Sequence, residues 1–163
     1  MARLIIALLL LMTVRTAALA AENISARAHY ECIWWSTEQM ANFDPNHPPP
    51  RKTRVRLDRW EYSDPVGVPH PDTVTLVVML TSSGVQKNLD IVVRTQWLGG
   101  RPAKAEALTS HIVSLEAGVP KIIEFQLPVK ATIDQNHPKL LRSSIWAGAK
   151  ELSHADLPIT VGD

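Results

Sequence analysis

The chain has 163 residues, of which 45% are hydrophobic and 20% charged, with 17 basic against 16 acidic residues and a formal net charge of +1. This near-neutral balance offers no basic field for phosphates or for an anionic membrane surface, so we expect no nucleic-acid partner. The length is typical of one domain, which can bury enough apolar surface to fold without disulfides.

Residues 1–20 are predicted to be a secretory signal peptide. Arg3 supplies the positive start, residues 4–12 form an apolar run, and Ala18-Leu19-Ala20 offers small residues to a signal peptidase. A membrane anchor is the alternative, but a spanning helix needs roughly 20 apolar residues and Arg15 interrupts this run. We therefore expect export to the periplasm or the extracellular space, with no membrane insertion after cleavage.

The remaining residues, 21–163, are predicted to form a single domain whose first strand runs from Ile24 to Trp35. Alternation along this strand places Tyr30 and Cys32 on the face toward the core. Cys32 is the only cysteine, so no internal disulfide can form, and we expect a small buried apolar side chain. A dimer linked through Cys32 is the alternative, and it requires this face to be exposed.

A proline-rich loop follows at residues 42–50, with the sequence NFDPNHPPP. Asp-Pro favours a turn and three successive prolines favour an extended segment, which indicates a rigid surface connector rather than a ligand for a proline-binding domain. Thr53 to Tyr62 is predicted to be the second strand. Its alternation breaks at Arg59, so we expect a bulge or bend near Trp60.

Residues 73–128 carry short apolar runs separated by Ser-Gly, Gly-Gly and Ala-Gly, a pattern typical of strands joined by turns. Strands are predicted at 73–81, covered on both faces, and at 89–97 and 121–127. The segment 102–117 is ambiguous. A strand over 108–115 is favoured because its neighbours are strands, and a short helix over 102–117 is the alternative.

Three weaker strand candidates lie at 129–134, 140–147 and 155–161. Together the candidates predict an all-β fold, an antiparallel β-sandwich of about seven to nine strands.

The succession Thr81-Ser82-Ser83-Gly84, then the strand at 88–93, then Leu115-Glu116-Ala117-Gly118 before the strand at 122–125 resembles immunoglobulin-like modules of bacterial envelope and surface proteins. The resemblance covers about 60 residues. It implies an immunoglobulin-like sandwich with a binding or structural role, and it carries over no catalytic residue.

The sharpest charge feature is a basic group around the second strand. An edge strand protected by positive charge is one interpretation. The other is a surface that binds a partner, aided by nearby aromatic side chains. The residues predicted for this surface are Arg51, Arg54, Arg56, Trp60, Tyr62 and Trp35.

Six histidines suggest a copper or zinc site, since exported sandwiches can hold these metals on His, Cys and Met. His29 and Cys32, however, point to opposite faces of a strand, and the sequence has no HxH or CxxC spacing. No G-x-S-x-G elbow or phosphate loop occurs either. We assign no metal, cofactor or catalytic residue.

The sequence therefore predicts an exported, non-catalytic protein with a binding or assembly role toward an envelope or secreted protein partner. A periplasmic metal-binding protein is the alternative function, and an enzyme without a recognisable motif is the third.

Overall fold

A computed structural model describes residues 23–34, 41–42, 44, 46–50, 53–61, 73–100, 107–129 and 137–160. The predicted signal peptide therefore lies outside the described residues. None of the described residues belongs to a helix with the length and hydropathy of a membrane span.

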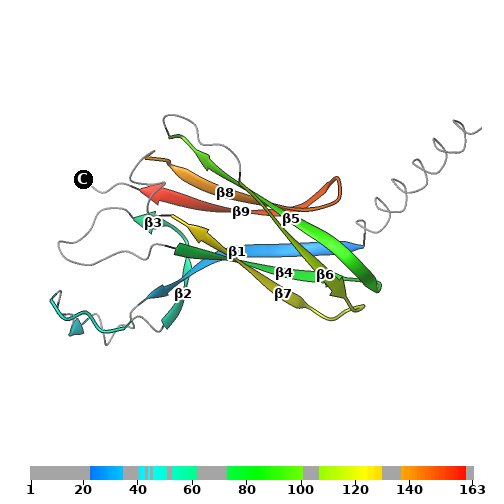
Figure 1. Ribbon diagram of the computed structural model, residues 1–163, viewed down its shortest axis with the longest axis horizontal. Coiled ribbons are helices and arrows are strands. Elements are labelled where there is room, and N and C mark those ends of the chain that lie inside the picture. Colours follow the sequence, from blue (N-terminus) through cyan, green and yellow to red (C-terminus); the bar gives the residue numbers. More distant parts are fainter. Residues whose placement is uncertain are drawn as a thin grey trace, which may run out of the picture.

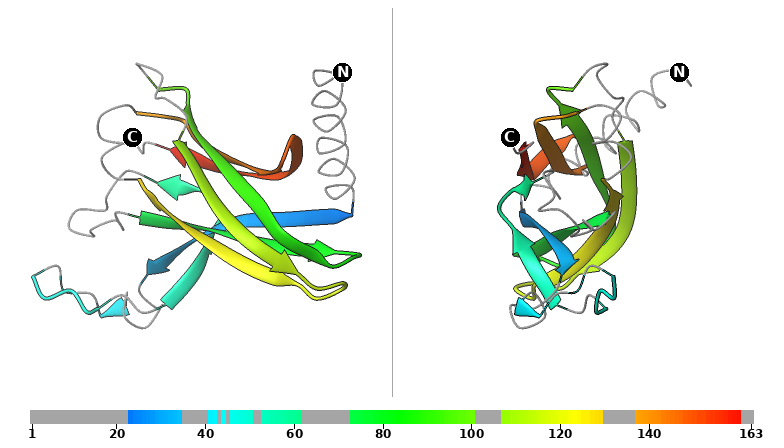
Figure 2. Two further views of the ribbon diagram at one scale, coloured as in Figure 1. Left: turned by 45° about the vertical axis from the view of Figure 1, so that its right-hand side comes forward. Right: turned by 90° about the vertical axis from the view of Figure 1, so that its left-hand side faces the viewer.

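The described residues form two packed β-sheets, which confirms the predicted all-β sandwich (Figures 1 and 2). One sheet has four strands in the order β2-β1-β4-β7 and the other has five in the order β3-β9-β8-β5-β6. All neighbouring strands are antiparallel except β3 and β9. The strands are β1 (Ile24–Trp34), β2 (Thr53–Leu57), β3 (Trp60–Glu61), β4 (Thr73–Ser82), β5 (Gln86–Leu98), β6 (Ala107–Leu115), β7 (Lys121–Pro128), β8 (Leu140–Ala147) and β9 (Lys150–Thr160).

Without the short strands β2 and β3, the sheets read β1-β4-β7 and β9-β8-β5-β6. This order is comparable with strands A, B and E in one sheet and G, F and C in the other sheet of immunoglobulin-like sandwiches. Asp58 and Arg59 separate β2 from β3, which confirms the bend expected near Trp60.

Within the ambiguous segment 102–117, the described residues Ala107–Leu115 form a strand, β6, and the helical alternative is wrong. Val113 and Leu115 are buried at the two-residue spacing of a strand, whereas Leu108 and Ile112, which a helix would have placed on the core stripe, face solvent. Of the weaker candidates, 140–147 and 155–161 correspond to β8 and β9. The candidate at 129–134 lies, apart from the buried Val129, outside the described residues.

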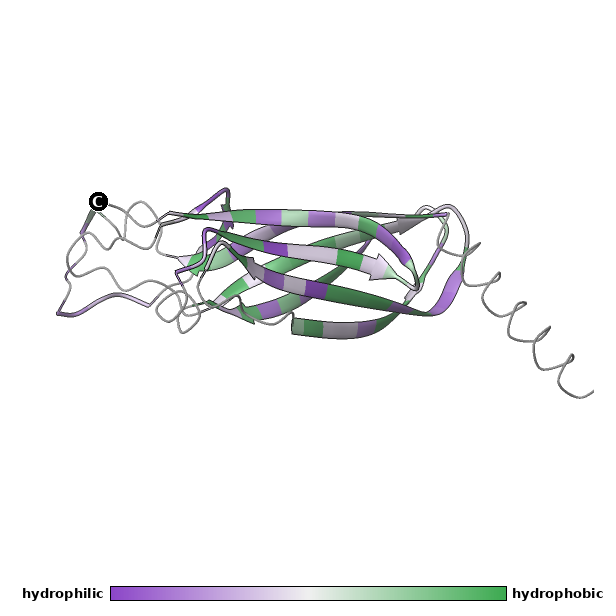
Figure 3. Cartoon of the chain, turned by 90° about the horizontal axis from the view of Figure 1, so that it is seen from above, coloured by the Kyte–Doolittle hydropathy of each residue, from purple (hydrophilic) through white to green (hydrophobic). Residues whose placement is uncertain are grey.

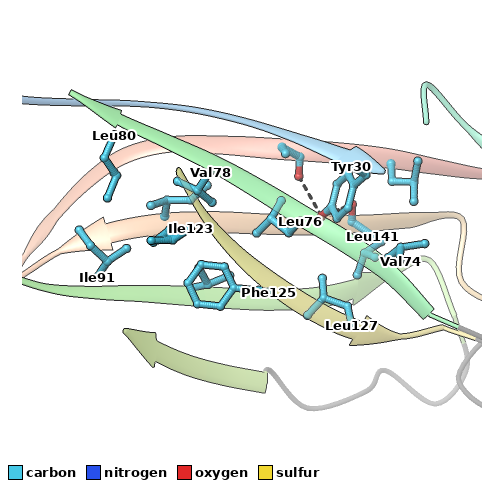
Figure 4. Packing of buried hydrophobic residues seen from close by; sticks show 14 of the residues in the cluster. Tyr30, Val74, Leu76, Val78, Leu80, Ile91, Ile123, Phe125, Leu127 and Leu141 are labelled. Atoms are coloured by element: carbon cyan, nitrogen blue, oxygen red, sulfur yellow. Dashed lines mark hydrogen bonds between the residues drawn. The ribbon is translucent and has the colours of Figure 1, made fainter. Parts of the chain in front are cut away.

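The core lies between the sheets and is built from alternate residues, visible as alternating hydropathy along the strands in Figure 3. The central strand β4 is buried on both faces, as expected from its continuous apolar sequence. Its inward side chains pack against Ile123, Phe125 and Leu127 of β7 and against the opposite sheet (Figure 4). On β1, Tyr30 and Cys32 are both buried, which confirms the predicted core face and argues against the Cys32-linked dimer.

Tyr30 also joins the two sheets through hydrogen bonds. From β1, its hydroxyl donates to Ser143 Oγ at 2.8 Å. The hydroxyl oxygen also lies 3.4 Å from the carbonyl oxygen of Leu141 (Figure 4) and 3.3 Å from that of Ala155. Ser143 Oγ in turn lies 3.2 Å from Thr95 Oγ1. Burial raises the pKa of the phenol well above its ordinary value, so the hydroxyl stays protonated and can donate.

In the proline-rich loop, Asp44 organises the turn that the sequence predicts. Its carboxylate accepts a hydrogen bond from the Asn46 amide at 2.9 Å, and its carbonyl accepts one from the His47 amide at 3.1 Å. Both are the local bonds by which an aspartate stabilises a turn.

Candidate interaction surface

The predicted binding surface around β2 is only partly within the described residues. Arg51, Tyr62 and Trp35 lie outside them. Arg54 and Arg56 are exposed on the outer face of β2. Trp60 is 4% exposed, so the prediction that it contacts a partner is wrong. The physical reason is that the two residues of β3 pair with β9, where Trp60 lies opposite Ile159 and its indole joins the core.

Arg54 is held across the outer face of the four-stranded sheet by two carboxylates. Its guanidinium pairs with Glu31 of β1 and lies 2.8 Å from Glu124 of β7. These two strands lie on either side of the central strand β4, so the arginine side chain passes over β4. His29 Nε2 lies 2.6 Å from the other oxygen of Glu31. The result is a network that covers Val77, which is buried although it points outward.

The electrostatics of this network favour its charged form. Burial raises the pKa of Glu31, but hydrogen bonds with His29 and Arg54 lower it by more, so the pKa lies below its usual value. Hydrogen bonds with Glu124 and Glu31 raise the pKa of Arg54. The positive charge of Arg54 is thus compensated within the chain rather than offered to a partner.

Arg56 is more open, because its ion pair with Asp58 has an N–O distance of 3.9 Å between two exposed side chains. The short strand β2 forms one edge of its sheet and carries both arginines. This arrangement fits the interpretation of an edge protected by charge against pairing with other chains.

A second exposed surface, which the sequence analysis missed, lies on β6 at the edge of the five-stranded sheet. Leu108 and Ile112 are 65% and 70% exposed and lie on the outer face of this strand. β6 has nine residues, and none of them is Lys, Arg, Asp, Glu or Pro. We call Ala107–Leu115 the β6 edge. It is the last strand of its sheet and runs beside β5 (Figures 1 and 2).

The other three described sheet edges are protected against pairing with another chain. β2 is short and carries two arginines. β3 covers only Ile159 and Thr160 of β9, and the rest of that edge of β9 carries Lys150, Glu151, Asp156 and Pro158. β7 carries Lys121 and Glu124 and ends at Pro128. Among the four edges, only the β6 edge combines length, exposed apolar side chains and the absence of charge.

The sequence contained a signal for this edge. Residues that would share one face of a helix lie on both faces of a strand, because a strand places alternate residues on opposite faces. Leu108 and Ile112 then share one face, while Val113 and Leu115 share the other. Once β6 is known to be an outermost strand with Val113 and Leu115 buried, Leu108 and Ile112 fall on its exposed face.

The described residues do not bring together a set of ligands for the copper or zinc site considered from the sequence. His29 points to the outer face while Cys32 is buried on the inner one, as the strand geometry predicts. Among the described residues no group of three or more His, Cys, Asp and Glu side chains could hold an ion.

Comparison with known proteins gives little. No protein-family model and no curated protein matches the chain. Among solved structures, one similar chain is the alkylpurine DNA glycosylase AlkC of Pseudomonas fluorescens, bound to DNA that contains an abasic-site analogue. The match has 17% identity and a TM-score of 0.45, and covers 55% of this chain but only 26% of the glycosylase.

This similarity to a DNA-bound protein contradicts the prediction that a nucleic-acid partner is absent, which rested on net charge alone. Net charge averages over the whole surface, whereas phosphate contacts need only a local group of basic side chains. The exclusion is therefore withdrawn. A likeness of this size argues neither for DNA binding nor for catalysis by this chain.

Proposed function

We propose that the protein is an exported, non-catalytic β-sandwich that binds another envelope or secreted protein chain through the β6 edge. The observation that carries this proposal is the contrast between this edge, with its exposed Leu108 and Ile112, and the three protected edges.

The chemistry of the contact follows from strand geometry. An edge strand pairs on one side only, so half of its backbone N–H and C=O groups point away from the sheet and can pair with an added strand. Main-chain hydrogen bonds then supply affinity, and side chains at alternate positions supply specificity. On the outer face of β6 those positions are Leu108, Ser110, Ile112 and Ser114, two apolar residues alternating with two small ones.

Site-specific photo-crosslinking in the exporting cell tests the proposal. A photoreactive residue at Ile112 should give a discrete covalent adduct with a protein partner. The same residue at Val85, which is 66% exposed in the turn after β4, is the matched control and should give none. Leu108→Lys should abolish the adduct formed at Ile112, because a charge on an edge strand opposes pairing. Equal labelling at both positions, or adducts that survive Leu108→Lys, would overturn the proposal.

A further inference from the structure

We infer that the partner that fits the β6 edge is a second copy of this chain, paired antiparallel about a two-fold axis at Ser110. The inference rests on the proposed function, because it names the occupant of the same edge. Pairing of this kind would join two five-stranded sheets into one continuous sheet.

The outer face of β6 is complementary to itself in this arrangement. Antiparallel pairing about Ser110 places Leu108 opposite Ile112 of the second copy, and by symmetry this contact occurs twice. Ser110 lies opposite its own counterpart. Directly opposite side chains in an antiparallel pair are the ones that interact most strongly, so both exposed apolar residues of each copy would be covered.

Neighbouring registers lack this match. A two-fold axis at His111 would place Leu108 opposite Ser114 and Ile112 opposite Ser110. An axis at Thr109 would place Leu108 opposite Ser110. Each shift leaves apolar side chains facing hydroxyls, and register is set where the pattern of apolar residues distinguishes one alignment.

The charges on β5, one strand back from the β6 edge, are compatible with the same orientation. On β5, Arg94 is the neighbour of Leu108 and Asp90 is the neighbour of Ile112. Antiparallel pairing about Ser110 therefore places Arg94 of one copy and Asp90 of the other on the same line across the joined sheet. A parallel arrangement in register would align like charges.

Cysteine crosslinking of the full exported chain, with Cys32→Ala to remove the native thiol, tests the register. Cysteine at Ser110 should form an intermolecular disulfide, because opposite residues in an antiparallel pair have Cα atoms about 4.5–5.5 Å apart, within disulfide reach. Ser114→Cys is the matched control on the same face of the same strand. In the inferred register its two copies lie eight residues apart, about 26 Å, and cannot be bridged.

Sedimentation of the uncrosslinked protein completes the test, and Ile112→Lys should convert a dimer to a monomer. Crosslinking at Ser110 alone, together with this conversion, supports the inference. Equal crosslinking at Ser110 and Ser114, a dimer without the Ser110 link, or a protein that stays monomeric would overturn it. A monomeric protein that still gives a photo-adduct with a different chain at Ile112 leaves the proposed function standing, whereas one that gives no adduct removes both.

Discussion

A single hydroxyl at Tyr30 connects the two sheets at a buried position. Tyr30→Phe keeps the packing of the ring but leaves the Leu141 and Ala155 carbonyls and Ser143 Oγ without this donor. Losing a buried hydrogen bond in this way should lower the free energy of unfolding by about 1–3 kcal/mol.

Urea unfolding measures this loss, and Ser25→Ala is the control. Ser25 Oγ also bonds a hydroxyl on a neighbouring strand, Thr81 Oγ1 at 2.6 Å, but that pair is exposed and water can replace it. Tyr30→Phe should therefore unfold at clearly lower urea than Ser25→Ala. Equal midpoints for the two variants would show that the Tyr30 hydroxyl does not stabilise the sandwich.

The carboxylate of Glu31 should make stability depend on pH. Its pKa in the folded protein lies below the ordinary value of 4.5, so the ionised form stabilises the fold. This contribution is complete above the ordinary pKa and is lost as the pH falls through the lowered one. Glu31→Gln should therefore flatten the decline in urea midpoint below pH 4.5.

The matching control for Glu31→Gln is Asp58→Asn, which removes an equal charge from the exposed pair with Arg56. It should leave the acid limb of the stability profile unchanged. Arg54→Gln removes the two ion pairs that Arg54 makes and should cost about 1 kcal/mol or less at neutral pH, as expected for pairs that water reaches. If the urea midpoint of Glu31→Gln still falls steeply at acid pH, other groups cause the pH dependence of stability.

At the scale of elements, the hairpin between β8 and β9 depends on one glycine. Ala147 pairs with Lys150, so the loop has two residues, and Gly148 opens it with φ 59°. A positive φ at the first loop position alone is the mark of a type II′ turn, which requires glycine there. Gly148→Ala should destabilise the protein by about 1–2 kcal/mol because an L side chain is strained in this conformation.

Gly84→Ala is the control for this turn, because a side chain at Gly84 meets open space and its φ is not positive. It should be neutral or slightly stabilising, through the reduced freedom of the unfolded chain. Thermal unfolding of both variants measures the difference. Similar transition temperatures would contradict the assignment of the turn type.

The elements themselves were predictable where local sequence decides them. The alternation of β1, the continuous apolar run of β4 and the glycine punctuation between strands all follow from side-chain periodicity and turn chemistry. The position of an element within a sheet does not. Nothing near Trp60 in the sequence states that β3 pairs with β9, a hundred residues away, so its burial could not be foreseen.

The same limit explains why the sequence favours the surface around β2. Arg54 looked available because its acidic partners, Glu31 and Glu124, lie on strands that only the fold brings beside it. The β6 edge was overlooked because exposure of Leu108 and Ile112 depends on β6 being outermost in its sheet. The local sequence pattern therefore predicts where the strands lie. Which strands are exposed at a sheet edge depends on pairing between residues far apart in the sequence.

For the whole molecule, Cys32 reports whether the sandwich unfolds as one unit. Its thiol is buried on the inner face of β1, which lies between β2 and β4. Labelling by a thiol reagent should therefore require global unfolding, and its rate across a urea series should follow the loss of tryptophan fluorescence. Ser114→Cys, exposed on β6, is the control and should react at once in the folded protein.

If Cys32 instead reacts at a rate independent of urea while fluorescence stays native, β1 and β2 open as a separate unit. In that case the four-stranded sheet would be the less stable half of the fold, and the Tyr30 hydroxyl would not hold the two sheets together.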